Sequence, residues 1–308
     1  MADILKKHNR TFYGVVSGHR DHADTYAEKY GIGHVYNTIE EVCEDENVDI
    51  VYIATPHNTH YEIAKKALKA GKHCLIEKSI TLNSRELEEL VALASENHLC
   101  LAEAMTTWHM PVMKEVKQIV ESGELGKVQV INANFGSIKP YDMENRFFNL
   151  KYAGGALLDI GVYALSAIRL FMEGKPSEVL SQWKLCAAGS DEEETILLKN
   201  EEGQLASAVI SLHSKQPKRV MISCEKAYIE IMEYPRAERA VITDAFSGEK
   251  RTIEMGVTAE ALYYEVCDFE ETIASGGNKM LLQYSRENME VMTKLRKEWK
   301  MQYPGEIW

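Results

Sequence analysis

Side chains able to bind a ligand or move a proton follow three apolar runs in the first third of the sequence, which end near residues 55, 76 and 103. They are, in chain order, Thr55, Pro56, Asn58, His60, Glu77, Lys78 and Glu103. If the runs are parallel strands, their carboxyl ends meet at one edge of a sheet, where open α/β sheets bind their ligands. We therefore expect these side chains to gather around one site.

A second segment, 154–163, carries Asp159 and Tyr163 four residues apart. That spacing is one turn of a helix, so both side chains can project from the same face. Gly154 and Gly155 just before them permit a close backbone approach. A lysine, an aspartate and a tyrosine together can move a proton to or from an alcohol oxygen, and near neutrality this requires that burial or a positive neighbour lower the lysine pKa.

The elements that must position these groups alternate in the first third of the chain. Apolar runs predict strands over 11–17, 48–55, 73–76 and 99–103, and amphipathic spacing predicts helices over 21–30, 60–70 and 83–97. Strands that alternate with helices at this spacing indicate an α/β fold with a doubly wound parallel sheet.

The rest of the chain predicts an α+β arrangement. Short alternating strands separated by polar turns indicate a large, mostly antiparallel open sheet. The expected strands are 179–187, 195–199, 205–213, 219–224, 228–232, 240–244 and 251–255, and the expected helices are 111–122, one after Gly161, 259–275 and 286–300. We expect a Rossmann-like domain over 1–106 and a substrate-binding and oligomerisation domain over 107–308, with the acidic run 191–194 in a solvated turn.

Composition narrows the class of protein. The 308 residues suit about two domains, and 35 basic against 47 acidic side chains give a net charge of −12 without a basic block, which argues against nucleic acid. No stretch is expected to provide the ~20 apolar residues that span a membrane. The beginning of the sequence shows no signal-peptide pattern, so we expect a cytoplasmic protein. The six cysteines form no Cys-x-x-Cys pair, so neither a zinc knuckle nor a disulfide framework is expected.

These residues resemble those of the Gfo/Idh/MocA family of NAD(P)-dependent oxidoreductases. The resemblance rests on Glu77-Lys78, on 154–163 and on 54–60, with further support from 103–105, 122–126, 146–149 and Tyr303-Pro304. It spans almost the whole chain in order, and it implies a Rossmann domain followed by a domain built on a large open sheet. It further implies hydride transfer between a nicotinamide and a hydroxyl-bearing carbon of a small sugar, polyol or dihydrodiol, and a homodimer through the C-terminal sheet.

The resemblance also implies a role for each site residue. Lys78 would donate or accept the proton beside the nicotinamide, Tyr163 would assist at the substrate alcohol, and Asp159 would orient the substrate or Lys78. NADP is mildly preferred over NAD, because Ser17 stands where an acidic residue would bind the ribose hydroxyls and Arg20 is close by. Ser79 and Trp108 replace a proline and an arginine that are usual in this family. The residues implied to line the dinucleotide are Ser17, Arg20, Thr55, Pro56, Asn58, His60, Glu77, Lys78 and Glu103.

One expected motif is missing. No G-x-G-x-x-G occurs among the 19 glycines, and Met1, Ile4 and Leu5 lie at helical spacing ahead of the first predicted strand. We expect the sequence to start inside the first helix of a Rossmann domain, without the strand and glycine loop that bind pyrophosphate. The strands 11–17 and 48–55 would then flank an empty position in the sheet.

Three interpretations of the whole chain remain. The first is the oxidoreductase, and the second is a non-catalytic relative that has lost dinucleotide binding and acts as a binding or interaction protein. The third, a metal-dependent hydrolase, rests only on His57 and His60, and because no third ligand accompanies them we expect no metal. For these two histidines, helix capping and cofactor contact are the favoured roles.

Overall fold

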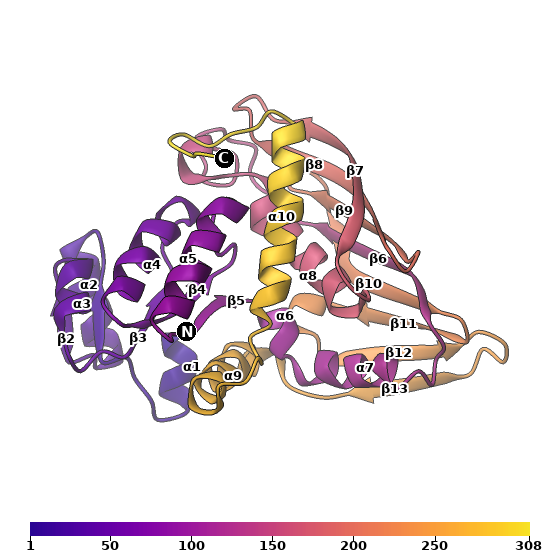
Figure 1. The fold of residues 1–308 in the computed structure, drawn as a ribbon, viewed down its shortest axis with the longest axis horizontal. Coiled ribbons are helices and arrows are strands. Elements are labelled where there is room, and N and C mark those ends of the chain that lie inside the picture. The colour runs from indigo at the N-terminus through magenta and orange to yellow at the C-terminus, as the bar shows by residue number, and fades with distance from the viewer.

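A computed structural model describes residues 1–308, and its N-terminal part is a parallel α/β unit (Figure 1). Strands β3, β4 and β5 form one parallel sheet, and β1 pairs in parallel with β2 in a separate sheet. The helices of this part are α1 (Ala2–Lys7), α2 (Arg20–Tyr30), α3 (Ile39–Glu44), α4 (His60–Lys69) and α5 (Ser84–Glu96). The strands are β1 (Gly14–Val16), β2 (His34–Tyr36), β3 (Ile50–Ile53), β4 (His73–Glu77) and β5 (Leu101–Ala104).

The predicted gap in the parallel sheet is confirmed for the described residues. Strands β1 and β3 belong to different sheets and share no ladder. The expected short helix at the beginning of the chain is also present as α1. The sequence reading missed β2 and α3, which are only three and six residues long.

The C-terminal part is an eight-stranded open sheet whose strand order is β13-β12-β11-β10-β6-β9-β8-β7. Every neighbouring pair is antiparallel except β6 with β9. Its strands are β6 (Val128–Gly136), β7 (Pro176–Leu185), β8 (Asp191–Asn200), β9 (Leu205–Ser211), β10 (Gln216–Cys224), β11 (Ala227–Met232), β12 (Arg239–Asp244) and β13 (Lys250–Glu254). The helices are α6 (Thr106–His109), α7 (Pro111–Glu121), α8 (Val162–Phe171), α9 (Ala261–Ser275) and α10 (Leu282–Glu298).

Helices cover one face of the large sheet (Figure 1). Helix α8 packs on β6, β9 and β10, and α10 lies between the sheet and the parallel domain, where it contacts α5, α8 and β7. Inward-facing residues such as Ile131, Ala133 and Phe135 alternate along β6 with polar residues on the other face. This alternation is the pattern of a sheet with one covered face, so β6, which the sequence reading missed, carried a usable signal.

The C-terminal tail ties the two parts together through a buried ion pair. Arg296 on α10 donates to both carboxylate oxygens of Glu306 at 2.6 and 2.9 Å, and also to the Leu82 carbonyl. Glu306 in turn accepts from the Asn83 side chain at 2.9 Å, and Asn83 caps α5. The pair therefore anchors α5 of the parallel domain to the end of the chain.

Two expectations about the sequence are wrong. The acidic run is not a solvated turn, because Asp191, Glu192 and Glu194 lie in β8 and are buried. Gly155 lies close against the Asp191 carboxylate, and the Leu157 N–H donates to that carboxylate at 2.5 Å. These contacts hold the acidic run in the core. A stretch apolar enough to cross a membrane by length and composition does exist at Leu150–Phe171, and 89% of the 18-residue window within it that meets this criterion is buried inside this fold.

Candidate active site

The site centres on Lys78 at the carboxyl end of β4. Its ammonium Nζ donates to the Asp159 carbonyl oxygen at 2.6 Å and to the Asp159 carboxylate at 3.1 Å. The same Nζ lies 5.2 Å from the centre of the Tyr163 ring. The structure therefore brings together the three predicted catalytic residues, which come from two parts of the chain.

An irregular helical turn delivers Asp159 to this point. Residues Leu157–Gly161 form a π-helical turn ahead of α8, so Asp159 and Tyr163 do not share one regular α-helix as the spacing suggested. The Ser79 hydroxyl donates to the Leu158 carbonyl at 3.0 Å and fastens this turn to the end of β4. The Lys78–Ser79 peptide bond is cis.

Lys78 and Asp159 each stabilise the charged form of the other. Burial alone would lower the pKa of Lys78, but the Asp159 charge and hydrogen bond outweigh it and raise that pKa above its ordinary value. Burial would raise the pKa of Asp159, yet Lys78 holds it below its usual range. The lowered pKa that a lysine would need to act as a base near neutrality is therefore not found in this arrangement, and Lys78 stays protonated at neutral pH.

Neutral aromatic groups flank the pair. Burial raises the pKa of Tyr163, partly offset by Lys78, so the phenol keeps its proton. Burial, with the positive charge of Lys78 close by, lowers the pKa of His57 to about 3. The His57 Nε2 lies 3.0 Å from the Lys78 carbonyl oxygen, within hydrogen-bond distance.

A cleft of about 420 Å³ opens beside the pair. One side consists of residues at the end of β3, and the other of the segment that leads into α8. The lining residues are Ala54, Thr55, Pro56, His57, Arg146, Phe147, Tyr152, Ala153, Gly154 and Asp159. Thr55, Pro56 and Asp159 were predicted for the site. Arg146 and Phe147 were noted only as part of the family resemblance, and Tyr152 was missed because nothing local distinguishes it.

Other predicted cofactor residues lie around the strand ends. His60 is fully buried, with Nδ1 3.0 Å from the Ser79 carbonyl oxygen and Nε2 2.8 Å from that of Thr55, so it ties two strand ends together. The buried Glu103 accepts from the Ile80 N–H at 3.1 Å, and Glu77 accepts from the Tyr52 hydroxyl. A direct cofactor contact of His60, Glu77 or Glu103 stays a prediction.

Three predicted residues lie nearer the surface. The exposed Asn58 donates to the Lys151 carbonyl oxygen across the cleft at 3.4 Å. Arg20, at the start of α2, donates to the Asn37 side chain at 2.6 Å and to the Val35 carbonyl at 3.2 Å. Ser17 accepts from the His19 N–H at 3.3 Å. Arg20 also pairs with Asp24 on the next turn of α2 at 2.9 Å, so it lies beside the end of β2 with its charge partly compensated.

The chain joins a parallel α/β domain to an open sheet and places a lysine–aspartate pair at the cleft beside the strand ends. This arrangement is that of two-domain oxidoreductases built on a Rossmann-like domain. Residues 2–105 match the model of the oxidoreductase family with an NAD-binding Rossmann fold, and residues 113–230 match the GFO/IDH/MocA C-terminal domain. The chain belongs to the Gfo/Idh/MocA oxidoreductase family.

Among curated proteins, the chain is similar to trans-1,2-dihydrobenzene-1,2-diol dehydrogenases. It is 30% identical to the Sus scrofa protein over 231 residues, which are 75% of this chain and 68% of that protein. It is 30% identical to the Mus musculus protein over 214 residues, which are 68% of this chain and 63% of that protein. The match to the mouse relative therefore spans less than two thirds of that relative's length.

Two solved structures share the fold. One is an aldose-aldose oxidoreductase from Caulobacter crescentus complexed with glycerol, with a TM-score of 0.86, 21% identity, and coverage of 97% of this chain and 92% of the other. The second is a 3-ketoreductase from Actinomadura kijaniata in complex with NADP and TDP-benzene, with a TM-score of 0.84, 22% identity, and coverage of 96% and 92%. At these identities the likeness concerns the fold.

Proposed function

We propose that this chain transfers hydride between a nicotinamide cofactor and a hydroxyl-bearing carbon of a small sugar, polyol or dihydrodiol. The observation that carries the proposal is the Lys78 ammonium, held by Asp159, which lines the cleft beside the end of β3. The names of its relatives support this substrate range, since they act on dihydrodiols and aldoses.

The chain's own residues handle the proton. In the direction of carbonyl reduction, Lys78 donates a proton to the carbonyl oxygen, because its ammonium form dominates at neutral pH. Asp159 orients this ammonium through two contacts, one from its carboxylate and one from its backbone. Tyr163 is only partly buried and its phenol stays protonated, so its hydroxyl can hold the same substrate oxygen.

The nicotinamide end of the site fits an NAD(P) cofactor, which supplies or accepts the hydride when bound. Thr55, Pro56 and His57 line the cleft beside Asp159 and would hold this end. Arg20, with Asn37 and Ser17 close by, would face the ribose and its 2′-phosphate, and this supports NADP. Residues 1–308 contain no glycine-rich turn of the Rossmann type to bind the pyrophosphate.

The test is turnover of a panel of sugars, polyols and dihydrodiols, followed by NADPH or NADP⁺ absorbance. We expect Lys78→Met to lower kcat/KM by about 10²–10⁴-fold, the range of general acid–base catalysis. Lys69→Met is the matched control, because Lys69 is exposed at the end of α4 and forms no ion pair. Unchanged turnover in Lys78→Met would contradict the assignment.

One observation favours a second candidate function, a non-catalytic relative that binds a ligand without hydride transfer. The parallel sheet is interrupted between β1 and β3. In a Rossmann fold, the strand at this position leads into the glycine-rich turn that binds the pyrophosphate of the dinucleotide. Titration of the chain with NADPH separates the two candidate functions, because the non-catalytic relative should show no saturable NADPH binding. Sugar binding without NADPH binding would favour it.

We also propose a homodimer through the outer face of the large sheet. No helix covers this face (Figure 1), and it exposes Leu180, Leu197 and Leu205 on adjacent strands at 66%, 51% and 50% of their surface. In the register of β7 with β8, Leu180 lies directly opposite Leu197. Exposed apolar side chains that cluster in this way favour protein association.

A further inference from the structure

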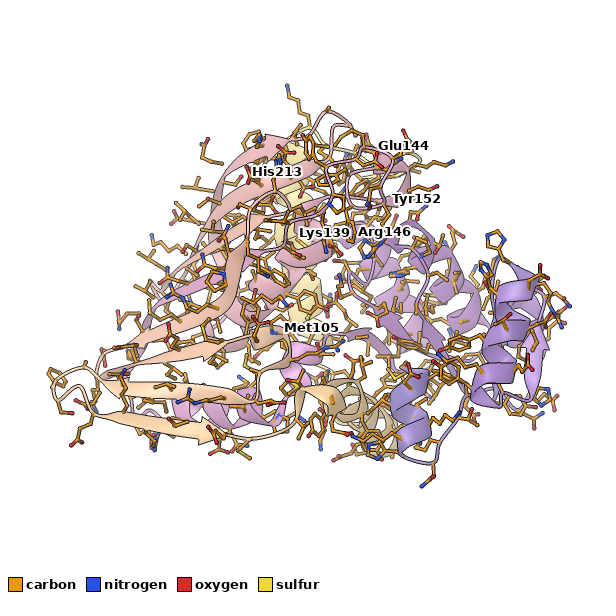
Figure 2. The ribbon with its side chains drawn as sticks, turned by 180° about the vertical axis from the view of Figure 1, so that it is seen from behind. Met105, Lys139, Glu144, Arg146, Tyr152 and His213 are labelled. Carbon is orange, nitrogen blue, oxygen red and sulfur yellow. The ribbon has the colours of Figure 1, made fainter.

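Three cations crowd the loop that leads from β6 to α8. Lys139, Arg146 and Lys151 lie within twenty residues of one another, and none of them forms an ion pair. Figure 2 shows Lys139, Arg146 and Tyr152 on the side of this loop that faces the parallel domain.

Phe147 holds two of these cations together. The Lys139 Nζ and the Arg146 guanidinium carbon each lie 4.2 Å from the centre of its ring. Cation–π contact with a shared ring offsets part of the repulsion between the two charges. Both charges therefore lie against the same ring, and neither forms an ion pair.

This ring belongs to the cavity of the proposed reaction. Arg146, Phe147 and Tyr152 line the same cleft as Asp159 and the Thr55–His57 segment. The cleft thus reaches the Lys78–Asp159 pair through Asp159 and carries a cation at Arg146. Its volume of about 420 Å³ lies within the usual range for small-molecule sites and accommodates a sugar with a further group attached.

The acidic groups of the same loop leave the cations available. The Asp142 carboxylate accepts from the Glu144 N–H at 3.0 Å, so it is engaged within its own turn. Glu144 is exposed and forms no ion pair. Asp159 is already paired with Lys78. Charge-assisted hydrogen bonds from a guanidinium favour the oxygens of a phosphate over a neutral hydroxyl.

We propose that the substrate of this site carries a phosphate group, which Arg146 binds in the cleft while Lys139, the second cation on the Phe147 ring, adds positive charge. The proposal rests on the proposed function for the reaction at Lys78. A phosphate ester of a sugar would place its sugar ring against Phe147 and Tyr152 and a hydroxyl near Lys78. The same chemistry would suit a phosphate of the dinucleotide, and the experiment must separate these two sources.

Binding is measured by calorimetry, which does not depend on turnover. The probes are inorganic phosphate, a panel of hexose phosphates, the corresponding free hexoses, and NADPH, in buffers of equal ionic strength made with chloride. We expect saturable binding of phosphate and of at least one hexose phosphate, with the free hexose at least tenfold weaker. Arg146→Ala should weaken the phosphate-bearing ligands by about 10- to 100-fold, as expected for charge-assisted hydrogen bonds, and Lys139→Ala should weaken them less.

The matched control is Arg85→Ala, since Arg85 is exposed on α5 and forms no ion pair. This variant should bind all probes as the wild type does. Absence of saturable phosphate and hexose phosphate binding, or binding that Arg146→Ala leaves unchanged, overturns the proposal. It is also overturned if Arg146→Ala weakens NADPH and not the hexose phosphates, because the cations then serve the dinucleotide. Arg146-dependent hexose phosphate binding without turnover would contradict the proposed function and leave this inference standing.

Discussion

Replacing Asp159 with asparagine removes one charge from the centre of the proposed site and leaves the shape almost unchanged. The Lys78 ammonium keeps its hydrogen bond to the backbone carbonyl of residue 159, 2.6 Å away in the wild type. Only the carboxylate charge, 3.1 Å from Nζ, is lost. The substitution therefore separates electrostatics from positioning.

The size of the effect follows from the distance. Two unit charges 3.1 Å apart attract by ~5 kcal/mol at an effective dielectric constant of ~20. That energy corresponds to ~4 pH units in the titration of a lysine. The side chains of Lys78 and Asp159 are 15% and 12% exposed, so solvent screens part of this attraction. We therefore expect the loss of the carboxylate charge to lower the pKa of Lys78 by about two pH units. In the Asp159→Asn variant, burial is no longer outweighed by the carboxylate charge, so we expect the pKa of Lys78 to lie below its ordinary value of ~10.4.

The assay is the pH dependence of kcat/KM for carbonyl reduction. In the wild type the rate should stay level from pH ~6 to pH ~9 and fall only above the ordinary lysine pKa of ~10.4, because deprotonation removes the proton donor. In Asp159→Asn the alkaline limb of the kcat/KM profile should move to lower pH by about two pH units, as estimated from the distance between the two charges. NMR titration of the Lys78 side chain gives the same pKa without turnover.

The control is Asp49→Asn, an exposed aspartate that forms no ion pair. This variant should reproduce the wild-type profile. An alkaline limb that Asp159→Asn leaves in place would refute the assigned coupling between Lys78 and Asp159. So would a wild-type limb centred near pH 7.

Three further predictions concern stability, pH and assembly. Arg296→Met should lower the free energy of unfolding by about 3–5 kcal/mol in denaturant titrations, because it strands the buried Glu306 carboxylate, whereas Arg251→Met at an exposed ion pair should cost about 0–1 kcal/mol. His57 is neutral in the folded chain, so the unfolded state binds the extra proton and stability should fall as pH drops below ~6.5, by up to ~1.4 kcal/mol per pH unit for this residue; an equal slope in wild type and His57→Gln would contradict it. Leu197→Lys should turn a dimer into monomers in sedimentation experiments if the exposed sheet face is the interface, and unchanged sedimentation would reject that face.

Local sequence patterns determined much of this protein. The alternation of strands and helices predicted the parallel domain, and the short polar-separated runs predicted the large sheet. Lys78, Asp159 and Tyr163 could be selected as a group because their residue types and motif positions, read against the family resemblance, indicate one kind of chemistry. The gap between β1 and β3 followed from the missing glycine motif.

Tertiary structure decided the rest, because contacts between distant segments have no local signature. The acidic run 191–194 looks solvated in sequence and is drawn into the core by the segment around Gly155. The protonation of Lys78 depends on an aspartate 81 positions along the chain, held there by a π-helical turn that the spacing did not reveal. Arg146 and Lys139 became candidates for a ligand site only when folding left both without carboxylate partners against the ring of Phe147, which lines the cleft with Arg146. Charge and burial are properties of the assembled site, so the sequence could name the groups and only the fold could set their states.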